Sequence, residues 1–437
     1  MIPETCGTKN NRSDRTVDDI RAAVPGDPGS PGSSPFSVGN MTKNNEALLQ
    51  PFAVREKGKL LRAGYTTGTC AAAAAKAAAV MLITGERIEA AAVRTPAGPE
   101  LLLPVEEIRT GPGFAECAVR KDAGDDPDIT DGILIYALVR AKLQPGSDAA
   151  EVVIRGGTGV GTVTRPGLDQ PPGEAAINSV PRKMITEGIR EAAAEAGLQG
   201  RVTVTVSAPE GLKLAEKTFN PRLGIRDGIS ILGTEGIVRP MSRRALTDTI
   251  RADIRVHAQG GCPVLAVPGN YGLRFLEETF GVPASDPVIM SNYVGETIDA
   301  AGEAGVKELL LAGHLGKFVK LAGGIMNTHS SEADARMELL CAHAVRCGAP
   351  ADLLKQILDC TVTQEAAQLL KAAGLLKAVS GSILRAAEAH VRRRAAEGMK
   401  TALIIYTLED GILAESTEAR PMLARRAKQM PETGAEG

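Results

Sequence analysis

Aromatic residues and net charge are both scarce in this chain of 437 residues. Only 3% of its residues are aromatic, Trp is absent, and 50 basic and 52 acidic side chains leave a formal net charge of −2. The core must therefore be mainly aliphatic, and no overall field favours nucleic acid or an anionic membrane as a partner. An anionic ligand would need a local binding site.

Cysteine occurs in no pattern that indicates a metal site or a disulfide framework. The seven Cys residues form no CxxC pair and no Cys/His spacing of the zinc type. We therefore expect reduced thiols and no protein-bound metal. The first residues, MIPETCGTKNNRSDRT, lack the apolar core of a secretory signal, and we expect no run to reach the roughly 18 apolar residues of a membrane-spanning helix. These absences predict a cytoplasmic protein.

The chain is long enough for two or three domains. Residues 1–55 are rich in Pro, Gly, Ser and Asn without periodicity, which predicts a disordered N-terminal extension. Strand and helix patterns alternate irregularly over residues 56–260 and predict a mixed α+β domain. Over residues 261–420, short apolar runs followed by glycine-bearing turns and helical patterns predict an α/β domain with βαβ units and a largely parallel sheet. Residues 421–437 are expected to be a flexible tail.

A hydroxyl-rich segment precedes an Ala-rich run that ends at Gly85. Thr66, Thr67 and Thr69 stand at its start, in a pattern typical of a capped helix. Amides and hydroxyls at a helix start also favour a carboxylate or phosphate. Ordinary capping explains the residues equally well, and no GxxxxGK[ST] motif supports a phosphate site.

Two further segments of the first half carry candidate chemistry. DAGDDPDITDG (122–132) contains five Asp residues, which could raise one another's pKa and leave one, such as Asp126, as a proton acceptor. A solvated turn is the commoner explanation for such a segment. The Gly- and Pro-rich stretch over residues 154–182, a predicted strand that leads into a long loop, is interpreted as a substrate-covering loop.

Polar and glycine residues follow the predicted strands of the second half, where ligands of parallel sheets bind. The candidates are Gly269, Asn270, Tyr271 and Gly272 in the first turn, Asn292 and Gly295 in the second, and His314 and Lys317 in the third. Asn can hydrogen-bond to a ligand, and Tyr can stack on a base. A histidine at such a position is more commonly structural than catalytic. His329 lies in a later capping turn, where an incidental role and a substrate contact are equally plausible.

Several segments, in order, resemble the signature blocks of one family, the cobalt-precorrin-5B C(1)-methyltransferases (CbiD family). They are RAGYTTGTC, KDAGDDPDITDG, GGTGVGTVTRPGLDQPPG, GISILGTEGIVRPMS, PGNYG, MSNYVGE and GHLGKFVKLAGGIMNTHS, and they span roughly residues 57–420. The resemblance implies an S-adenosylmethionine-dependent enzyme that methylates ring carbon 1 of cobalt-precorrin-5B, giving cobalt-precorrin-6A in anaerobic cobalamin biosynthesis. Cobalt would then arrive inside the tetrapyrrole substrate.

Within this resemblance we assign hypothetical roles to the candidates. The methyl donor would contact Gly269, Asn270, Tyr271, Gly272, Asn292 and Gly295, the macrocycle would contact Thr66, Thr67, Thr69, Lys317 and His329, and His314 and Asp126 would be catalytic. A small-molecule kinase that uses the hydroxyl-rich helix start and a non-catalytic tetrapyrrole carrier stay open as alternatives. The sequence also leaves open a homo-oligomer and transient contacts with neighbouring pathway enzymes.

Overall fold

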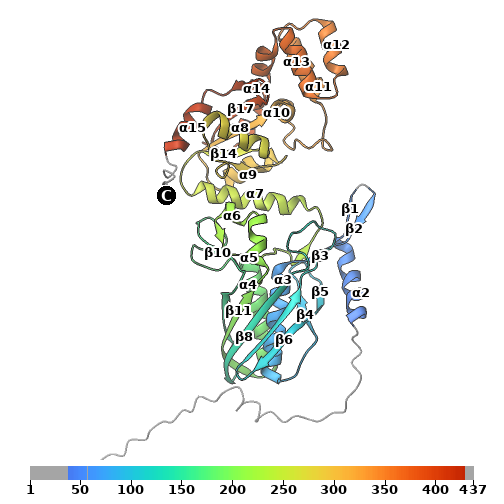
Figure 1. The fold of residues 1–437 in the computed structure, drawn as a ribbon, viewed down its shortest axis with the longest axis vertical. Helices are drawn as coiled ribbons and strands as arrows, with labels where there is room; N and C mark the ends of the chain where they lie inside the picture. Colours follow the sequence, from blue (N-terminus) through green and yellow to red (C-terminus); the bar gives the residue numbers. More distant parts are fainter. Residues whose placement is uncertain (1–37, 57, 429–437) are drawn as a thin grey trace, which may run out of the picture. The chain divides into compact units, whose positions relative to one another are not determined.

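The computed structural model describes residues 38–56 and 58–428 of the chain. They divide into two compact units (Figure 1). Unit 2 consists of residues 166–168 and the described residues from Arg243 onward, and unit 1 contains the others. Each unit encloses its own buried apolar residues, so the two have independent architectures.

Helix α7 (Arg243–Ala258) belongs to unit 2, so the division comes earlier in the chain than residue 260, the boundary expected from the sequence. The physical reason is the apolar side of this helix. Ile250 and Ile254 are buried in the same core as the sheet of unit 2. Burial of these side chains binds the helix to that sheet through the hydrophobic effect.

The predicted disordered extension falls partly outside the described residues, which exclude residues 1–37. Its remainder is structured, contrary to the prediction: it forms helix α2 (Val38–Leu49) and the 3₁₀ turn η1 (Gln50–Phe52). The Asn45 side chain donates to the Leu102 carbonyl at 2.7 Å and accepts from the Leu102 amide at 3.1 Å. This pair of hydrogen bonds holds α2 against a strand that lies far away in the sequence.

Unit 1 is built on a five-stranded sheet of order β6-β7-β8-β11-β9. Its strands are β6 (Glu106–Gly111), β7 (Phe114–Arg120), β8 (Leu134–Pro145), β11 (Leu198–Ser207) and β9 (Glu151–Gly156). Only the β11–β9 pair is parallel. Beside this sheet β4 (Ala90–Arg94) and β5 (Glu100–Pro104) form a hairpin. The N-terminal domain is therefore of mixed type, as predicted.

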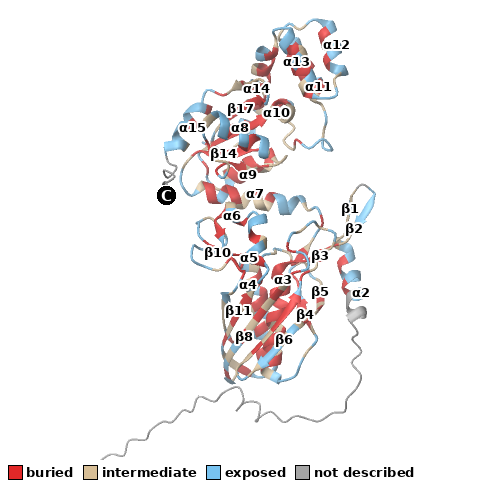
Figure 2. Cartoon of the chain, viewed as in Figure 1, coloured by how far each residue is buried: buried red, intermediate tan, exposed pale blue. Residues whose placement is uncertain are grey.

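Helix α3 (Thr67–Thr84) runs through the core of unit 1 and contacts β7, β8 and helix α4 (Ser179–Glu195). Its caps are those predicted: the Thr66 hydroxyl accepts from the Thr69 amide at the start, and Gly85 adopts φ 77° at the end. The helix is long and apolar enough to span a membrane, contrary to the expectation that no run reaches this length. However, 78% of it is buried inside the unit, where its small Ala side chains permit close packing (Figure 2).

Short elements complete unit 1. They are β1 (Val54–Glu56), β2 (Lys59–Leu61), β3 (Gly64–Tyr65), β10 (Thr162–Val163), α5 (Gly211–Leu214), η2 (Ala215–Lys217), α6 (Asn220–Leu223), β12 (Ile225–Arg226) and β13 (Ile237–Val238). The strands pair as β1–β2, β10–β12 and β13–β3, all antiparallel. The Gly-rich stretch thereby becomes part of the packed framework, because β10 lies within it.

Unit 2 contains the predicted parallel sheet, in the order β15-β14-β16-β17-β18. Its strands are β14 (Val264–Val267), β15 (Val288–Ile289), β16 (Glu308–His314), β17 (Lys400–Thr407) and β18 (Gly411–Glu415). The pairs β14–β15, β14–β16 and β16–β17 are parallel, and only β18 is antiparallel to its neighbour. The predicted fold class is therefore confirmed.

Helices cover both faces of this sheet. They are α8 (Asn270–Phe280), α9 (Val294–Glu303), α10 (Leu315–Leu321), α11 (Arg336–Arg346), α12 (Ala351–Asp359), α13 (Thr363–Ala372), α14 (Leu376–Arg394) and α15 (Ala419–Lys428). Neighbouring strand residues such as Val264 and Leu265 enter separate cores, one shared with α7 and α9–α14 and the other with α8 and α15. Met422 and Leu423 of α15 are buried, so the predicted flexible tail is helical as far as Lys428, and residues 429–437 lie outside the described residues.

Candidate functional site

A cavity of about 720 Å³ opens at the carboxyl edge of the unit 2 sheet. After β14 the chain passes through α8 to β15 on one side, and from there through α9 to β16 on the other side of β14. This reversal between adjacent strands is the position where open α/β sheets bind ligands. Residues that follow β14, β15 and β16 all line the cavity, so the predicted turns do meet at one site.

The β14–α8 turn contributes Gly269, Asn270, Tyr271 and Gly272 to the cavity lining. Asn270 is exposed, and the Tyr271 side chain is 69% exposed, so both are available to a ligand. Gly272 is required for packing, because a Cβ there would lie 2.6 Å from the Cβ of Val267. Helix α8 begins here without a side-chain cap, so no side chain at the N-cap accepts a hydrogen bond from its first backbone amides.

The β15–α9 turn contributes Asn292 but not Gly295. The Asn292 carbonyl accepts from the Thr328 amide at 2.9 Å, which joins this turn to a second lining segment. Gly295 is not among the lining residues, and a Cβ there would lie 2.7 Å from the Cζ atom of Arg394. Its role is therefore close packing against that side chain, and contact with the methyl donor has no support from its position.

His314 ends β16, lines the cavity and caps α10. Its Nδ1 accepts from the Gly316 amide at 3.1 Å, so the neutral ring must carry its proton on Nε2. Burial lowers the pKa of His314, which favours this neutral form. The ring also meets Tyr406 edge-to-face, with centroids 5.9 Å apart. His314 thus has the structural role that is commoner for a histidine at a strand end. It also lies where its Nε2–H can donate to a ligand.

Two lysines one turn apart on α10 line the cavity in different ways. Lys317 is half-buried and makes no hydrogen bond or ion pair with the residues that the structure describes; burial and then the nearby Lys320 ammonium lower its pKa. Lys320 is only 2% exposed, and its Nζ donates to the Thr328 carbonyl at 3.1 Å and the Ala333 carbonyl at 2.7 Å. Lys317 is available to a ligand, whereas Lys320 holds a loop.

The loop between α10 and α11 forms one wall of the cavity, through Thr328, His329 and Ser330. His329 is exposed, and its Nδ1 accepts from the Ser331 amide at 3.1 Å and lies 2.7 Å from the Ser331 hydroxyl oxygen. The residue is thus a capping histidine that also reaches the cavity. The capping role is therefore present in the structure, and a contact between His329 and substrate stays a prediction.

The hydroxyls proposed to face the macrocycle are used inside unit 1. Thr66 and Thr69 bond to each other, and Thr69 donates to the Gly236 carbonyl at 2.7 Å. The Thr67 hydroxyl accepts from the Leu232 amide at 3.0 Å. All three threonines are buried. This arrangement is the ordinary capping alternative, and it also removes the feature on which the kinase alternative rested.

The five-Asp segment is a structural turn in unit 1. Asp122 pairs with Arg62 through two bonds of 2.6 and 2.8 Å, and Asp128 pairs with Lys121 at 2.5 Å. Burial raises the pKa of both carboxyls, but the paired cations and hydrogen bonds outweigh it, so both pKa values fall. The mutual rise expected from the sequence is wrong for these two. Asp126 accepts from the Met241 amide at 2.9 Å and has no visible catalytic partner among the described residues.

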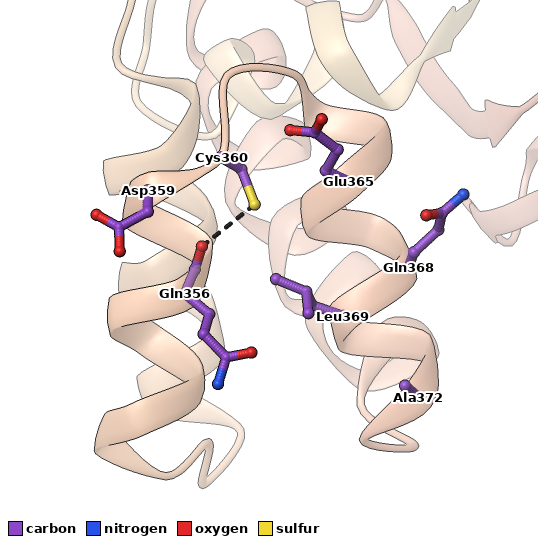
Figure 3. A pocket seen from close by; sticks show the side chains of 7 residues that line it. All are labelled: Gln356, Asp359, Cys360, Glu365, Gln368, Leu369 and Ala372. Atoms are coloured by element: carbon purple, nitrogen blue, oxygen red, sulfur yellow. Dashed lines mark hydrogen bonds between the residues drawn. The ribbon is translucent and has the colours of Figure 1, made fainter.

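Residues of α12 and α13, together with Cys360 between them, line a second, open hollow of about 620 Å³, which contains none of the predicted residues (Figure 3). Cys360 lines this hollow, and its thiol donates to the Gln356 carbonyl at 3.2 Å. Burial and then Glu365 and Asp359 raise the pKa of Cys360, so this thiol is not activated. Within residues 38–56 and 58–428, no three His, Cys, Asp or Glu side chains gather to hold a metal ion.

Comparison with known proteins decides the family. Residues 54–240 match the CbiD family and residues 327–417 match the CbiD C-terminal domain. A cobalt-precorrin-5B C(1)-methyltransferase of Ruminiclostridium cellulolyticum is 44% identical over 387 residues, which cover 87% of this chain and 99% of that protein. The chain belongs to the CbiD family. The family resemblance expected from the sequence blocks is thereby confirmed.

Two further curated relatives agree with this placement. A cobalt-precorrin-5B C(1)-methyltransferase of Thermoanaerobacter sp. is 41% identical, covering 85% of this chain and 99% of its own length, and one of Citrobacter koseri is 45% identical, covering 74% and 83%. A 1.9 Å crystal structure of the cobalamin biosynthesis protein CbiD from Archaeoglobus fulgidus is 27% identical and covers 66% of this chain and 88% of that one, with a TM-score of 0.35.

Proposed function

We propose that this CbiD protein transfers the methyl group of S-adenosylmethionine to ring carbon 1 of cobalt-precorrin-5B, giving cobalt-precorrin-6A and S-adenosylhomocysteine. The observation that carries the proposal is 44% identity over 99% of a relative that bears this activity in its name. The substrate brings its own cobalt, and the reaction takes place in the cytoplasm.

The cavity of unit 2 supports this proposal by its position at the carboxyl edge of the sheet and by the different side chains on its two sides. The β14–α8 turn presents Asn270 and the exposed Tyr271 ring, which suit the hydrogen-bonding and stacking groups of a nucleoside. The α10 side presents Lys317 and the Nε2–H of His314, which suit an anionic macrocycle. Its volume of about 720 Å³ lies within the range of small-molecule binding sites, roughly 300–1,000 Å³.

The chemistry asks the protein mainly to position two reactants. The electron pair of the ring carbon forms the new C–C bond with the methyl group while the C–S bond breaks and its pair stays on sulfur, leaving a neutral thioether. Alignment of two bound reactants can contribute roughly 7–11 kcal/mol in favourable intramolecular cases. In the neutral ring of His314, Nδ1 accepts from the Gly316 amide and is not free to act as a base, so we assign the Nε2–H a hydrogen-bond donor role toward the macrocycle.

The assay that tests the function uses purified protein, cobalt-precorrin-5B and methyl-labelled S-adenosylmethionine under anaerobic conditions. We expect the pigment to gain the mass of one methyl group together with the label. Binding of the pigment without label transfer would instead identify a tetrapyrrole carrier. Binding of ATP without binding of S-adenosylmethionine would favour a kinase.

Asn270→Ala is expected to weaken binding of S-adenosylhomocysteine by about 10-fold, because one or two hydrogen bonds worth roughly 0.5–1.5 kcal/mol each would be lost. Isothermal titration calorimetry gives the dissociation constant directly. Lys377→Ala provides a control, since Lys377 is exposed on α14 and does not line the cavity. Equal affinity in wild type and Asn270→Ala would remove this residue from the donor site.

The pH dependence of the reaction should reveal His314. Burial keeps its pKa below the usual value of about 6.5, so the ring is neutral at pH 7 and becomes protonated only as the pH falls below that value. Protonation would place an N–H against the Gly316 amide, so kcat/KM should decline on the acid side. His314→Asn keeps a helix cap that does not titrate. Its pH–rate profile should lack the His314 component, and an unchanged acid limb would contradict this assignment.

A further inference from the structure

The charged groups that line the unit 2 cavity are all cationic at neutral pH. They are Lys317, Lys320 and Arg336, and none of the described lining residues is Asp or Glu. Arg336 is paired with Asp334, through bonds of 2.6 and 2.9 Å, so its charge is largely offset. The two lysines therefore leave an excess of about two positive charges in a concave, partly desolvated site, where electrostatic interactions are stronger than in water.

Lys320 places a buried ammonium in the wall, and burial lowers the pKa of this group. A buried ammonium is costly unless it is hydrogen-bonded, and here two of its three N–H donors are used by the carbonyls of Thr328 and Ala333. These carbonyls carry no net charge, so the positive charge is solvated by the loop without being neutralised. The same bonds fix the backbone that places His329 and Ser330 at the cavity.

Lys317 differs from the other basic residues of the cavity because it has no partner in the described part of the chain. It is half-buried beside a second ammonium, an arrangement that is unfavourable in the absence of an anion. The side chain would gain most from a carboxylate placed against it, since that contact relieves the repulsion and forms a charge-assisted hydrogen bond.

We propose that Lys317, Lys320 and the loop segment Thr328–Ser330 form a carboxylate-binding subsite, in which Lys317 contacts the anion and Lys320 acts as a positioning residue for the wall. This inference rests on the proposed function, which supplies two ligands that carry carboxylates. One is the macrocycle, with its carboxylate side chains, and the other is the methionine part of the methyl donor. In either case the cationic wall repels the sulfonium centre, so the donor's sulfur lies toward the uncharged β14–α8 turn.

The test compares Lys317→Gln, Lys317→Arg and a surface control, Lys377→Gln, in the full chain. Lys377 is exposed on α14 and does not line the cavity. Cobalt-precorrin-5B binding is followed by absorbance titration without a methyl donor, and S-adenosylhomocysteine binding by calorimetry. Lys317→Gln should weaken one of the two by about 10- to 100-fold, as expected for loss of a hydrogen bond between charged groups. The affinities of Lys317→Arg for both ligands should stay within a few-fold of the wild-type values. Those of Lys377→Gln should equal the wild-type values.

The two titrations identify the source of the carboxylate. Weaker binding of cobalt-precorrin-5B assigns the subsite to the macrocycle, and weaker binding of S-adenosylhomocysteine assigns it to the donor; either effect should diminish as salt is raised. Unchanged affinity for both ligands in Lys317→Gln would overturn the inference even if methyl transfer is intact. A different result would refute the proposed function and leave the subsite standing: wild type binds the pigment more tightly than Lys317→Gln does, but wild type transfers no methyl group.

Discussion

Lys320→Met is expected to lower the free energy of unfolding of unit 2 by about 2–4 kcal/mol, because it leaves two buried carbonyls without a donor at roughly 1–3 kcal/mol each and recovers part of this by burying an apolar side chain. The Lys320 ammonium donates to the carbonyls of Thr328 and Ala333, which belong to the loop that forms one wall of the cavity. The same substitution should therefore also loosen the loop that carries His329.

Urea unfolding followed by circular dichroism measures the first effect, and amide hydrogen exchange of residues 326–334 measures the second. The matched control is Lys377→Met on α14, where the ammonium is exposed and has no such partners among the described residues, so the change should stay within about 0.5 kcal/mol. If Lys320→Met were as stable as this control, with unchanged exchange in the loop, the ammonium would not be holding the wall.

The local rules of the sequence predicted those elements whose signals are contained in a short segment. Thr66 and Gly85 mark the ends of α3 because capping depends on residues within one turn. The parallel sheet of unit 2 was predictable for the same reason, since short apolar runs followed by glycine-bearing turns are local patterns. Helix α2 was missed because it is stabilised by bonds between Asn45 and Leu102, which are remote in the sequence.

The candidate site was predictable in outline from the order of the strands. Residues after parallel strands lie at one edge, so Asn270, Asn292 and His314 were expected together, and they do line one cavity. Lys320 had one available signal, its position one turn after Lys317 on the same helix. Its burial could not be foreseen, because the carbonyls that solvate it belong to a loop whose path depends on the fold.

The unit 1 candidates show that a polar residue can be assigned a binding role wrongly when its partners within the fold are not known. A hydroxyl such as that of Thr67 and a carboxylate such as that of Asp128 have the same side-chain chemistry in a binding site and in a cap. The partners distinguish them: the Leu232 amide and the Lys121 ammonium occupy these groups inside the unit. Sequence patterns specify what a side chain can bind, and tertiary structure specifies what it already binds.

Gly159→Ala is expected to destabilise unit 1 by about 2–5 kcal/mol, the sum of roughly 1–2 for a positive φ and 1–3 for overpacking. Gly159 adopts φ +77°, and a Cβ there would lie 1.8 Å from the Ala208 carbonyl oxygen. Its own carbonyl accepts from the Ile229 amide at 2.9 Å, so the backbone cannot move away without breaking that bond. The Gly-rich stretch is thus held by backbone contact at this point.

Gly173→Ala separates the two contributions, because Gly173 belongs to the same stretch and adopts φ +91°, but a Cβ added there would have no described atom within 4 Å. It should cost only the conformational part, about 1–2 kcal/mol. Thermal and urea unfolding of both variants give the difference, which measures the clash with Ala208. If the two variants were equally stable, the chain around Gly159 would be free to yield, and a covering loop that moves would again be the better interpretation of this stretch.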